Sequence, residues 1–220
     1  ALRLLSTRDF DGLLFDMDGT LIDSTESVER SWGAWAAREG IEGFTLEHGK
    51  PAIATVSTFI PADRVDESVR FLIDLEINDT EGVVALPGAI ALTTAIPRDR
   101  WAIVTSSARE LAHRRLAAAG LGEPDALVSF DDVERGKPHP EPFLLGAHTL
   151  AVDPRRCLAF EDTVAGLVAS RAAGCTTIGV LGTHTEAELS PYADAVVGSL
   201  DSVLAEFRTG SLTVAGSPLR

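Results

Sequence analysis

The chain has 220 residues, of which 45% are hydrophobic and 24% are charged. This composition suits one large globular domain or a core with a smaller insertion, and it excludes a largely disordered chain. The formal net charge of −14 argues against nucleic acid and anionic membranes as partners, because the protein cannot neutralise their phosphates. The chain has only two cysteines, Cys157 and Cys175, and we expect both to be reduced thiols, which favours the cytoplasm. It has no apolar run of roughly 18 residues and no signal-peptide pattern at its start, so we expect a soluble protein that is not secreted.

The first half of the chain predicts one strand followed by a helical insertion. The strand, Leu13–Asp16, is a continuous apolar run that ends in an acid. The following segment contains two helical stretches, Ser24–Glu39 and Ala62–Ile77, and no convincing buried strand. We expect it to be a small α-helical cap, with hinges just after Gly19 and at Pro87-Gly88. The predicted domains are residues 1–19 and 88–220 for the core and residues 20–87 for the cap.

The second half alternates predicted strands with helices. Ser107 and Glu110 have the spacing of a capping box that opens a helix, and Asp162–Ala173 predicts another helix. The last residues, Thr209–Arg220, are small and polar and predict a loosely held tail. Continuous apolar strands alternating with helices predict an α/β fold with a doubly wound (Rossmann-like) parallel sheet, whose ligand site lies beyond the carboxyl ends of the strands. The strands expected here are Trp101–Thr105, Ala126–Phe130, Cys157–Glu161, Thr177–Leu181 and Ala195–Val197.

Two carboxylates, Asp16 and Asp18, stand at the end of the first predicted strand. The two-residue period of a strand aims both to the same side. Burying paired acids is costly unless a cation neutralises them or they divide charged and protonated roles. The pair therefore predicts a metal-assisted nucleophile beside an acid/base, with a helix cap or Asx-turn as the alternative. A calcium-binding EF-hand is excluded, because Leu21 and Ser27 stand where that loop needs Gly and Glu.

A second acidic pair, Glu161-Asp162, also follows an apolar strand and precedes a helix. Acids at the ends of two strands can converge on one divalent cation. Oxygen ligands, few of them from protein, fit Mg²⁺ better than Zn²⁺. The alternative is a helix start that favours negative charge.

Ser106 and Ser107 at the end of a predicted strand, and Lys137 in a Gly-Lys-Pro turn, fit a phosphate cradle. Hydroxyls and free amides at a strand-to-helix turn bind phosphate, and an ammonium supplies the charge that phosphoryl transfer requires. Plain helix capping is the alternative for the serines, and we expect Ser107 to cap in either case. Seventeen of the nineteen basic residues are Arg, so the two lysines, Lys50 and Lys137, favour places where a compact ammonium fits and a planar guanidinium does not.

The four features described above follow one another along the chain as Asp16 with Asp18, Ser106, Lys137, and Glu161-Asp162. In this order they resemble the motifs of the haloacid dehalogenase superfamily of aspartyl-phosphate-forming phosphotransferases, and the resemblance covers nearly the whole chain. The position of the helical insertion is similar to that in the subclass with a cap between its first two motifs, which contains β-phosphoglucomutase and many sugar phosphatases. One departure is Thr163-Val164 after the second acidic pair, where relatives often carry a small residue and then Pro. The segments that look most like glycerol phosphatases and sugar-phosphate phosphatases are His48–Ala52, Leu86–Ala89, Trp101–Ser106 and Gly136–Pro142.

The resemblance implies a division of roles among the core residues. Asp16 would be the nucleophile and Asp18 the acid/base, while Ser106 and Lys137 would bind the transferred phosphoryl group. The Mg²⁺ ligands implied are the Asp16 carboxylate, the carbonyl of Asp18 and Asp162, with Glu161 acting through a water.

The expected reaction is Mg²⁺-dependent hydrolysis of a small polyol or sugar phosphate by a monomer or weak homo-oligomer. Substrate contacts are expected from Thr20, His48, Lys50 and Ser107, with loop packing as the alternative for His48 and Lys50. One rival function is a sugar phosphomutase of the β-phosphoglucomutase type, which needs a second phosphate clamp in the cap. The other rival is a catalytically silent sugar-phosphate binding protein, which the complete set of motif acids disfavours.

Overall fold

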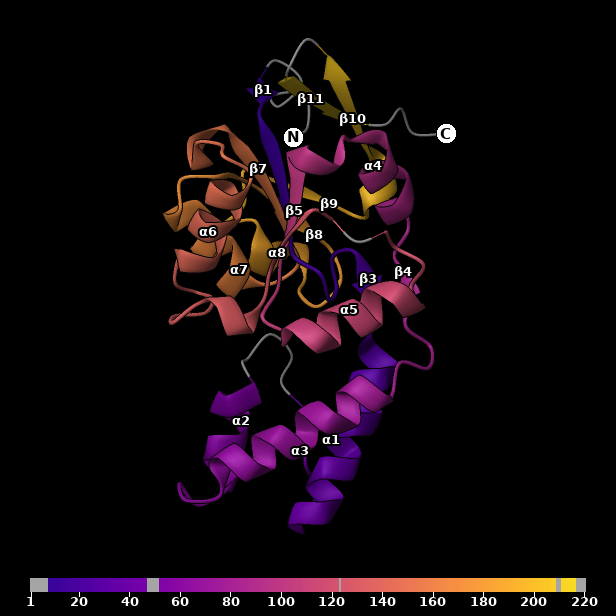
Figure 1. The fold of residues 1–220 in the computed structure, drawn as a ribbon, viewed down its shortest axis with the longest axis vertical. Helices are drawn as coiled ribbons and strands as arrows, with labels where there is room; N and C mark the ends of the chain where they lie inside the picture. Colours follow the sequence, from indigo (N-terminus) through magenta and orange to yellow (C-terminus); the bar gives the residue numbers. More distant parts are fainter. Residues whose placement is uncertain (1–7, 47–51, 123, 209–210, 217–220) are drawn as a thin grey trace.

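A computed structural model describes residues 8–46, 52–122, 124–208 and 211–216. Its centre is a parallel sheet of six strands in the order β6-β5-β2-β7-β8-β9 (Figure 1). Every predicted strand is present, within two residues at either end, and the predicted α/β fold with a parallel sheet is confirmed. The six strands are β2 (Gly12–Phe15), β5 (Trp101–Val104), β6 (Ala126–Val128), β7 (Cys157–Glu161), β8 (Thr176–Val180) and β9 (Ala195–Val197).

Helices cover both faces of this sheet, which is why its strands are apolar throughout. On β2, Leu13 and Phe15 point to the face that also contacts α4 and α5, whereas Leu14 packs against α6 and α7 on the other face. Phe15 stacks on Phe160 of β7 with ring centroids 4.9 Å apart. The helices of the core are α4 (Ala89–Ala95), α5 (Arg109–Ala118), α6 (Glu141–Thr149), α7 (Val164–Ala172) and the short α8 (Glu186–Leu189). Short 3₁₀ turns lie at Arg98–Arg100, Phe130–Asp132, Pro154–Arg156 and Leu200–Ser202.

A second, antiparallel sheet closes the end of the core that is remote from the carboxyl ends of the strands. It consists of β1 (Asp9–Phe10), β11 (Ser211–Gly216) and β10 (Val203–Arg208), in that order. The prediction of a loose tail is therefore wrong for residues 211–216. Leu212 and Val214 are completely buried in the core and alternate with Ser211 and Thr213. This strand therefore buries one of its faces, although the sequence analysis considered only the small and polar residues of the segment.

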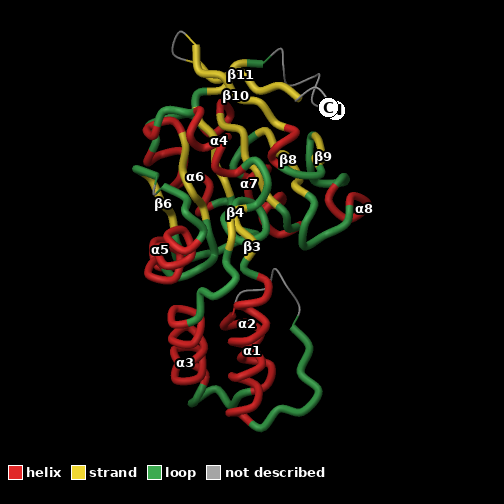
Figure 2. The backbone as a smooth tube through the Cα atoms, turned by 90° about the vertical axis from the view of Figure 1, so that its right-hand side faces the viewer, coloured by secondary structure: helices red, strands yellow, loops and turns green. Residues whose placement is uncertain are grey.

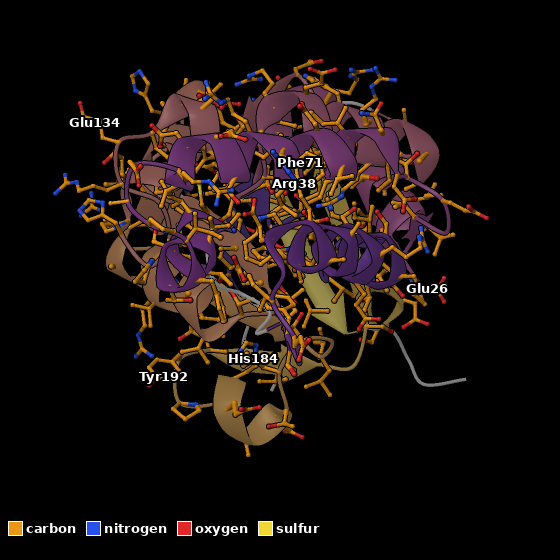
Figure 3. All side chains as sticks on the ribbon, turned by 90° about the horizontal axis from the view of Figure 1, so that it is seen from below. Glu26, Arg38, Phe71, Glu134, His184 and Tyr192 are labelled. Carbon is orange, nitrogen blue, oxygen red and sulfur yellow. The ribbon has the colours of Figure 1, made fainter. Side chains whose placement is uncertain are left out.

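The helical insertion packs around a hydrophobic cluster of its own, below the sheet in Figures 1 and 2. Trp35 is fully buried in it, and its indole nitrogen donates to Ser68 Oγ at 2.7 Å. Arg38 of α1 lies over the ring of Phe71 of α3, 3.9 Å from its centroid (Figure 3), and this cation–π contact stabilises the packing of the two helices. The three helices are α1 (Thr25–Glu39), α2 (Ala52–Phe59) and α3 (Val65–Asn78).

Two short antiparallel strands, β3 (Ile22–Asp23) and β4 (Val84–Ala85), join the insertion to the core (Figure 2). Gly88 follows them with a φ of 87°, and a Cβ there would lie 2.1 Å from the backbone nitrogen of Asp201, so glycine is required at this turn. The domain limits of 19/20 and 87/88 stay a prediction. Ile22, which these limits assign to the cap, packs in the hydrophobic core of the sheet. Among the described residues, no helix is long and apolar enough to span a membrane.

Candidate active site

A cavity of about 530 Å³ lies between the carboxyl ends of β2, β5 and β7 and the helices of the cap. The parallel sheet explains its position, since all six strands end at the same edge. Its walls combine core residues that carry charge or hydroxyl groups with cap residues that are mostly apolar. The core side includes Asp16, Asp18, Ser106, Ser107, Lys137, Glu161 and Asp162, and the cap side includes Val28, Trp32, Ile53, Asp66, Val69, Arg70, Ile73 and Glu76.

Lys137 connects three parts of the site through one buried ammonium group. Its Nζ donates to Asp16 Oδ1 at 2.6 Å, to Glu161 Oε1 at 2.6 Å and to the carbonyl of Val104 at 2.8 Å. An ammonium has three protons, so each of them has an acceptor. Burial opposes its charge, but Asp16 and Glu161 together raise the pKa of Lys137 above its ordinary value. A planar guanidinium could not point donors at three such groups from one atom.

Asp16, Glu161 and Asp162 bring carboxylate oxygens within 4.8 Å of one another. Burial raises the pKa of Asp162 to about 7, with Glu161 adding to the effect and the Thr183 hydroxyl lowering it. Burial also raises the pKa of Asp16, which the Lys137 ammonium opposes. Three acids against one ammonium leave the site short of positive charge.

Both oxygens of Asp162 are buried without a well-formed hydrogen bond to any described residue. Unpartnered buried carboxylate oxygens are costly, and a hard divalent cation bound there would both occupy them and neutralise the excess charge. The donor set therefore fits Mg²⁺. Gly19 makes room for this carboxylate, because a Cβ at its φ of 85° would lie 2.1 Å from Asp162 Oδ2.

Glu161 differs from Asp162 because its own oxygens are already engaged. Oε1 accepts from Lys137, and Oε2 accepts from the backbone nitrogen and the hydroxyl of Thr163 at 3.0 and 2.8 Å. Thr163 also caps α7, since its hydroxyl accepts from the nitrogen of Gly166. A Cβ at Gly166 would lie 1.7 Å from Glu161 Oε1. Glu161 is thus fixed in place by protein groups, while Asp162 keeps its oxygens available.

Asp18 is held by three donors from different parts of the chain. Oδ1 accepts from Ser24 Oγ at 2.7 Å and from Arg115 Nη1 at 2.9 Å, and Oδ2 accepts from Ser107 Oγ at 3.0 Å. The prediction that Ser107 caps a helix is wrong. Helix α5 begins two residues later, and its N-cap residue, Ala108, offers no capping side chain; the Ser107 hydroxyl turns to Asp18 because this carboxylate lies within its reach.

Arg115 and Glu76 are site residues that the sequence analysis missed. Arg115, on α5 of the core, is 2% exposed, and its Nη2 donates to Oε1 of Glu76, on α3 of the cap, at 3.3 Å. Burial raises the pKa of Glu76, while Arg115 lowers it. A signal was present in the sequence: Arg115 lies four residues after the buried Leu111, and Glu76 four after the buried Leu72, so each is a charge on the buried stripe of its helix.

The remaining predicted residues divide into three groups. Ser106 is exposed to the cavity at the end of β5. Thr20 was expected to contact substrate but is fully buried and does not line the cavity; its backbone nitrogen bonds to the carbonyl of Met17, and this tight turn carries its side chain away from the open space. His48 and Lys50 lie outside the described residues.

Residues 10–174 match the family model described as haloacid dehalogenase-like hydrolase. The chain is 41% identical to hexitol phosphatase A of Escherichia coli (strain K12), over 87% of this chain and 92% of that protein. It is 31% identical to glycerol-1-phosphate phosphohydrolase 2 of Saccharomyces cerevisiae, over 76% and 73%. Among solved structures, a hydrolase from Pseudomonas syringae matches with a TM-score of 0.75 and 25% identity, over 86% of this chain and 94% of that one.

Proposed function

The chain belongs to the haloacid dehalogenase-like hydrolases and is a phosphomonoesterase of that family, and from this premise we propose the details of its reaction. It hydrolyses phosphate esters of small polyols or sugars, requires Mg²⁺, and passes through an aspartyl-phosphate on Asp16. The observation that carries the proposal is the arrangement of Asp16, Asp162 and Lys137. Carboxylate oxygens of the two acids lie within 4.8 Å of each other, both oxygens of Asp162 lack a hydrogen bond to a described residue, and the buried ammonium donates to Asp16.

In the first step an oxygen of Asp16 attacks phosphorus, the bond from phosphorus to the ester oxygen breaks, and the phosphoryl group moves to the carboxylate. Asp18 gives a proton to the departing alkoxide and takes one from the water that later hydrolyses the aspartyl-phosphate. Ser106 binds the oxygens of the transferred group, where negative charge gathers, and the Lys137 ammonium, held against Asp16, neutralises that charge. This division rests on the family, and the contacts of Lys137 with Asp16 support it.

The metal would be held by the carboxylates of Asp16 and Asp162 together with the carbonyl of Asp18. Glu161 supports the site through Lys137 and contributes to the metal through a water, because its oxygens already accept from protein donors. When bound, Mg²⁺ supplies positive charge to the phosphoryl oxygens during the displacement.

The cap supports a neutral, hydroxyl-rich leaving group rather than a second phosphate. Its described charged residues at the cavity are Asp66, Arg70 and Glu76, and two acids with one Arg make a poor clamp for a dianion. This favours the phosphatase over the phosphomutase, which needs such a clamp. Lys50, which could supply one, lies outside the described residues.

The experiment is a phosphate-release assay over glycerol, hexose, deoxyhexose and hexitol phosphates, with Mg²⁺ or with excess chelator, and with Asp16→Asn as the inactive control. We expect catalytic release of inorganic phosphate in Mg²⁺ alone, without any bisphosphate activator. Full activity in chelator would reject the metal requirement. Isomerised sugar phosphate in place of free phosphate would select the mutase, and binding without turnover would select the silent binding protein.

Action in the cytoplasm as a monomer or weak homo-oligomer, with no nucleic-acid or membrane partner, stays a prediction from the composition.

A further inference from the structure

The ion pair between Glu76 and Arg115 crosses from the cap to the core at the edge of the catalytic site. Glu76 lies on α3 and Arg115 on α5, two helices that pack against each other. Both side chains line the cavity that contains Asp16 and Asp18, although the side chain of Arg115 is 3% exposed and that of Glu76 is 11% exposed. A buried ion pair costs desolvation free energy that its mutual attraction barely repays, so a stabilising role alone explains it poorly.

The position of this pair relative to Asp18 indicates which part of a substrate it meets. To give a proton to the leaving alkoxide, Asp18 has to contact the ester oxygen. Arg115 Nη1 lies 2.9 Å from Asp18 Oδ1, and Glu76 lies next to Arg115 on the cap side. Since Asp18, Arg115 and Glu76 line the same cavity, the carbon that follows the ester oxygen, and the group borne by the next carbon, can face the pair.

The pair also offers suitable hydrogen-bonding groups for a neutral hydroxyl. One oxygen of Glu76 accepts from Arg115, which leaves acceptor capacity on the carboxylate. The terminal nitrogens of Arg115, Nη1 and Nη2, carry four protons and donate to three described acceptors, on Asp18, Ser107 and Glu76, so the guanidinium keeps a donor for a ligand. With Asp18 included, the three groups carry two negative charges and one positive charge, which disfavours an anionic substituent at this place.

We propose that Glu76 and Arg115 form a subsite that binds the hydroxyl on the carbon adjacent to the phosphorylated one, with Glu76 as acceptor and Arg115 as donor. The proposal rests on the phosphatase function proposed above and deepens it: the enzyme selects vicinal hydroxy esters, the pattern of a polyol or sugar phosphate, over esters that lack that hydroxyl. Because one partner comes from the cap and the other from the core, the subsite is complete only when the cap lies over the sheet.

Two isomeric esters test the proposal, 2-hydroxypropyl phosphate and 3-hydroxypropyl phosphate. They have the same size and charge and differ in where the free hydroxyl lies. For the unmodified enzyme we expect kcat/KM to favour the 2-hydroxy isomer by ~10–100-fold, the range for hydrogen bonds to charged groups. In Glu76→Gln this ratio should fall by about tenfold, because the amide keeps the shape of the side chain but is a weaker acceptor and loses the ion pair.

Arg115→Met is the second variant. It removes the donor and also a contact of Asp18, so it lowers kcat for both esters, but the ratio between them should approach one. The control is Glu39→Gln: Glu39 is a buried cap carboxylate that accepts from Arg64 and Ser68 and does not line the cavity. In this control variant the ratio of kcat/KM for the two esters should equal that of the unmodified enzyme.

The outcomes separate the subsite from the function on which it rests. If the unmodified enzyme hydrolyses both isomers equally, or if Glu76→Gln and Arg115→Met lower both reactions by the same factor, the subsite is overturned and the pair is structural. Phosphate release would still support the phosphatase. If neither isomer nor any polyol or sugar phosphate releases phosphate, the proposed function fails and the subsite fails with it.

Discussion

The two sides of the active-site cavity are built in different ways. On the core side Lys137 and Glu161 are saturated with partners, since Lys137 has an acceptor for each proton and Glu161 accepts from both Lys137 and Thr163. Asp162 alone of this acidic cluster keeps both oxygens for a metal. On the cap side the lining is mostly apolar, and its charges, such as Asp66 and Arg70, are spread along one helix. A saturated network holds groups in one geometry, whereas a sparse one adapts to different ligands.

We therefore propose that the core performs the chemistry and that the cap, together with Arg115 of the core, selects the substrate. Changes at Asp16 and Lys137 should then lower kcat for every ester, and changes on the cap side should alter kcat/KM for particular esters.

The largest effect is expected for Asp16→Asn. The amide keeps the size of the side chain but is neither a competent nucleophile nor a strong metal ligand, so kcat should fall by at least ~10³-fold for every ester while the fold stays intact. Steady-state phosphate release and a thermal melt measure the two effects. The matched control is Asp125→Asn at the exposed Asp125, which should change neither. Near-normal activity of Asp16→Asn would refute the nucleophile.

Lys137→Arg should cost ~10²–10³-fold in kcat for polyol and aryl phosphates alike, because charge is kept but the three-way contact of the ammonium is lost. The measurement is kcat on one ester of each type in saturating Mg²⁺. A loss confined to the polyol ester would place Lys137 in substrate selection and break the division between core and cap.

Asp162 gives a pH-dependent prediction for the metal-free protein. Its pKa is raised from 3.8 to about 7 by burial, with the Glu161 charge adding to this. The folded state therefore binds this proton more tightly than the unfolded state, and stability should fall as the pH rises from about 4 to about 7. Acids whose pKa is lowered in the folded protein, such as Asp132 at about 2, change its stability only at pH values below this range.

The measurement is the melting temperature in chelator from pH 5 to 8, then at pH 7.5 with Mg²⁺. Mg²⁺ at roughly 100-fold its Kd should raise the melting temperature by about 5 °C. In Asp162→Asn both the decline with pH and the response to Mg²⁺ should shrink, and in Glu161→Gln the response to Mg²⁺ should shrink less. An equal response to Mg²⁺ in all three proteins would remove Asp162 from the metal site.

The smallest effect is expected for Arg70→Gln on the cap side. Loss of one exposed cation at the cavity should raise KM for polyol phosphates by up to ~10-fold and leave an aryl phosphate nearly unaffected. Arg64→Gln is the control, because Arg64 binds Glu39 and does not line the cavity. A large fall in kcat on the aryl ester would contradict a role limited to substrate selection.

The sequence predicted the central sheet well because its strands are continuous apolar runs. Cys157–Glu161 and Ala195–Val197 were placed to the residue, since covering both faces of a strand leaves a strong signal. The antiparallel sheet escaped notice because Leu212 and Val214 bury only one face of a short strand beside Gly210 and Gly216. A period-two pattern of two apolar residues is too short to stand out.

The site was predictable where the chemistry is local and was missed where it depends on contacts between distant elements. Asp16 and Asp18 share one strand end, so spacing alone placed them together. The contact of Glu76 with Arg115 joins two residues that are 39 positions apart in the chain and lie on different helices, and no local pattern fixes which buried charges meet. Thr20 was expected to contact substrate because its place after Asp18-Gly19 resembles that in the phosphatase relatives, whereas the turn buries it.

The most direct test of the central claim, covalent catalysis by Asp16 of the core, is the stereochemistry at phosphorus. A phosphorothioate monoester of glycerol, made chiral at phosphorus with two oxygen isotopes, is hydrolysed in water that carries the third, and the configuration of the product thiophosphate is determined. Attack by Asp16 followed by attack of water gives two in-line displacements, each of which inverts phosphorus, so we predict net retention. Net inversion would mean a single direct attack by water and would contradict the aspartyl-phosphate.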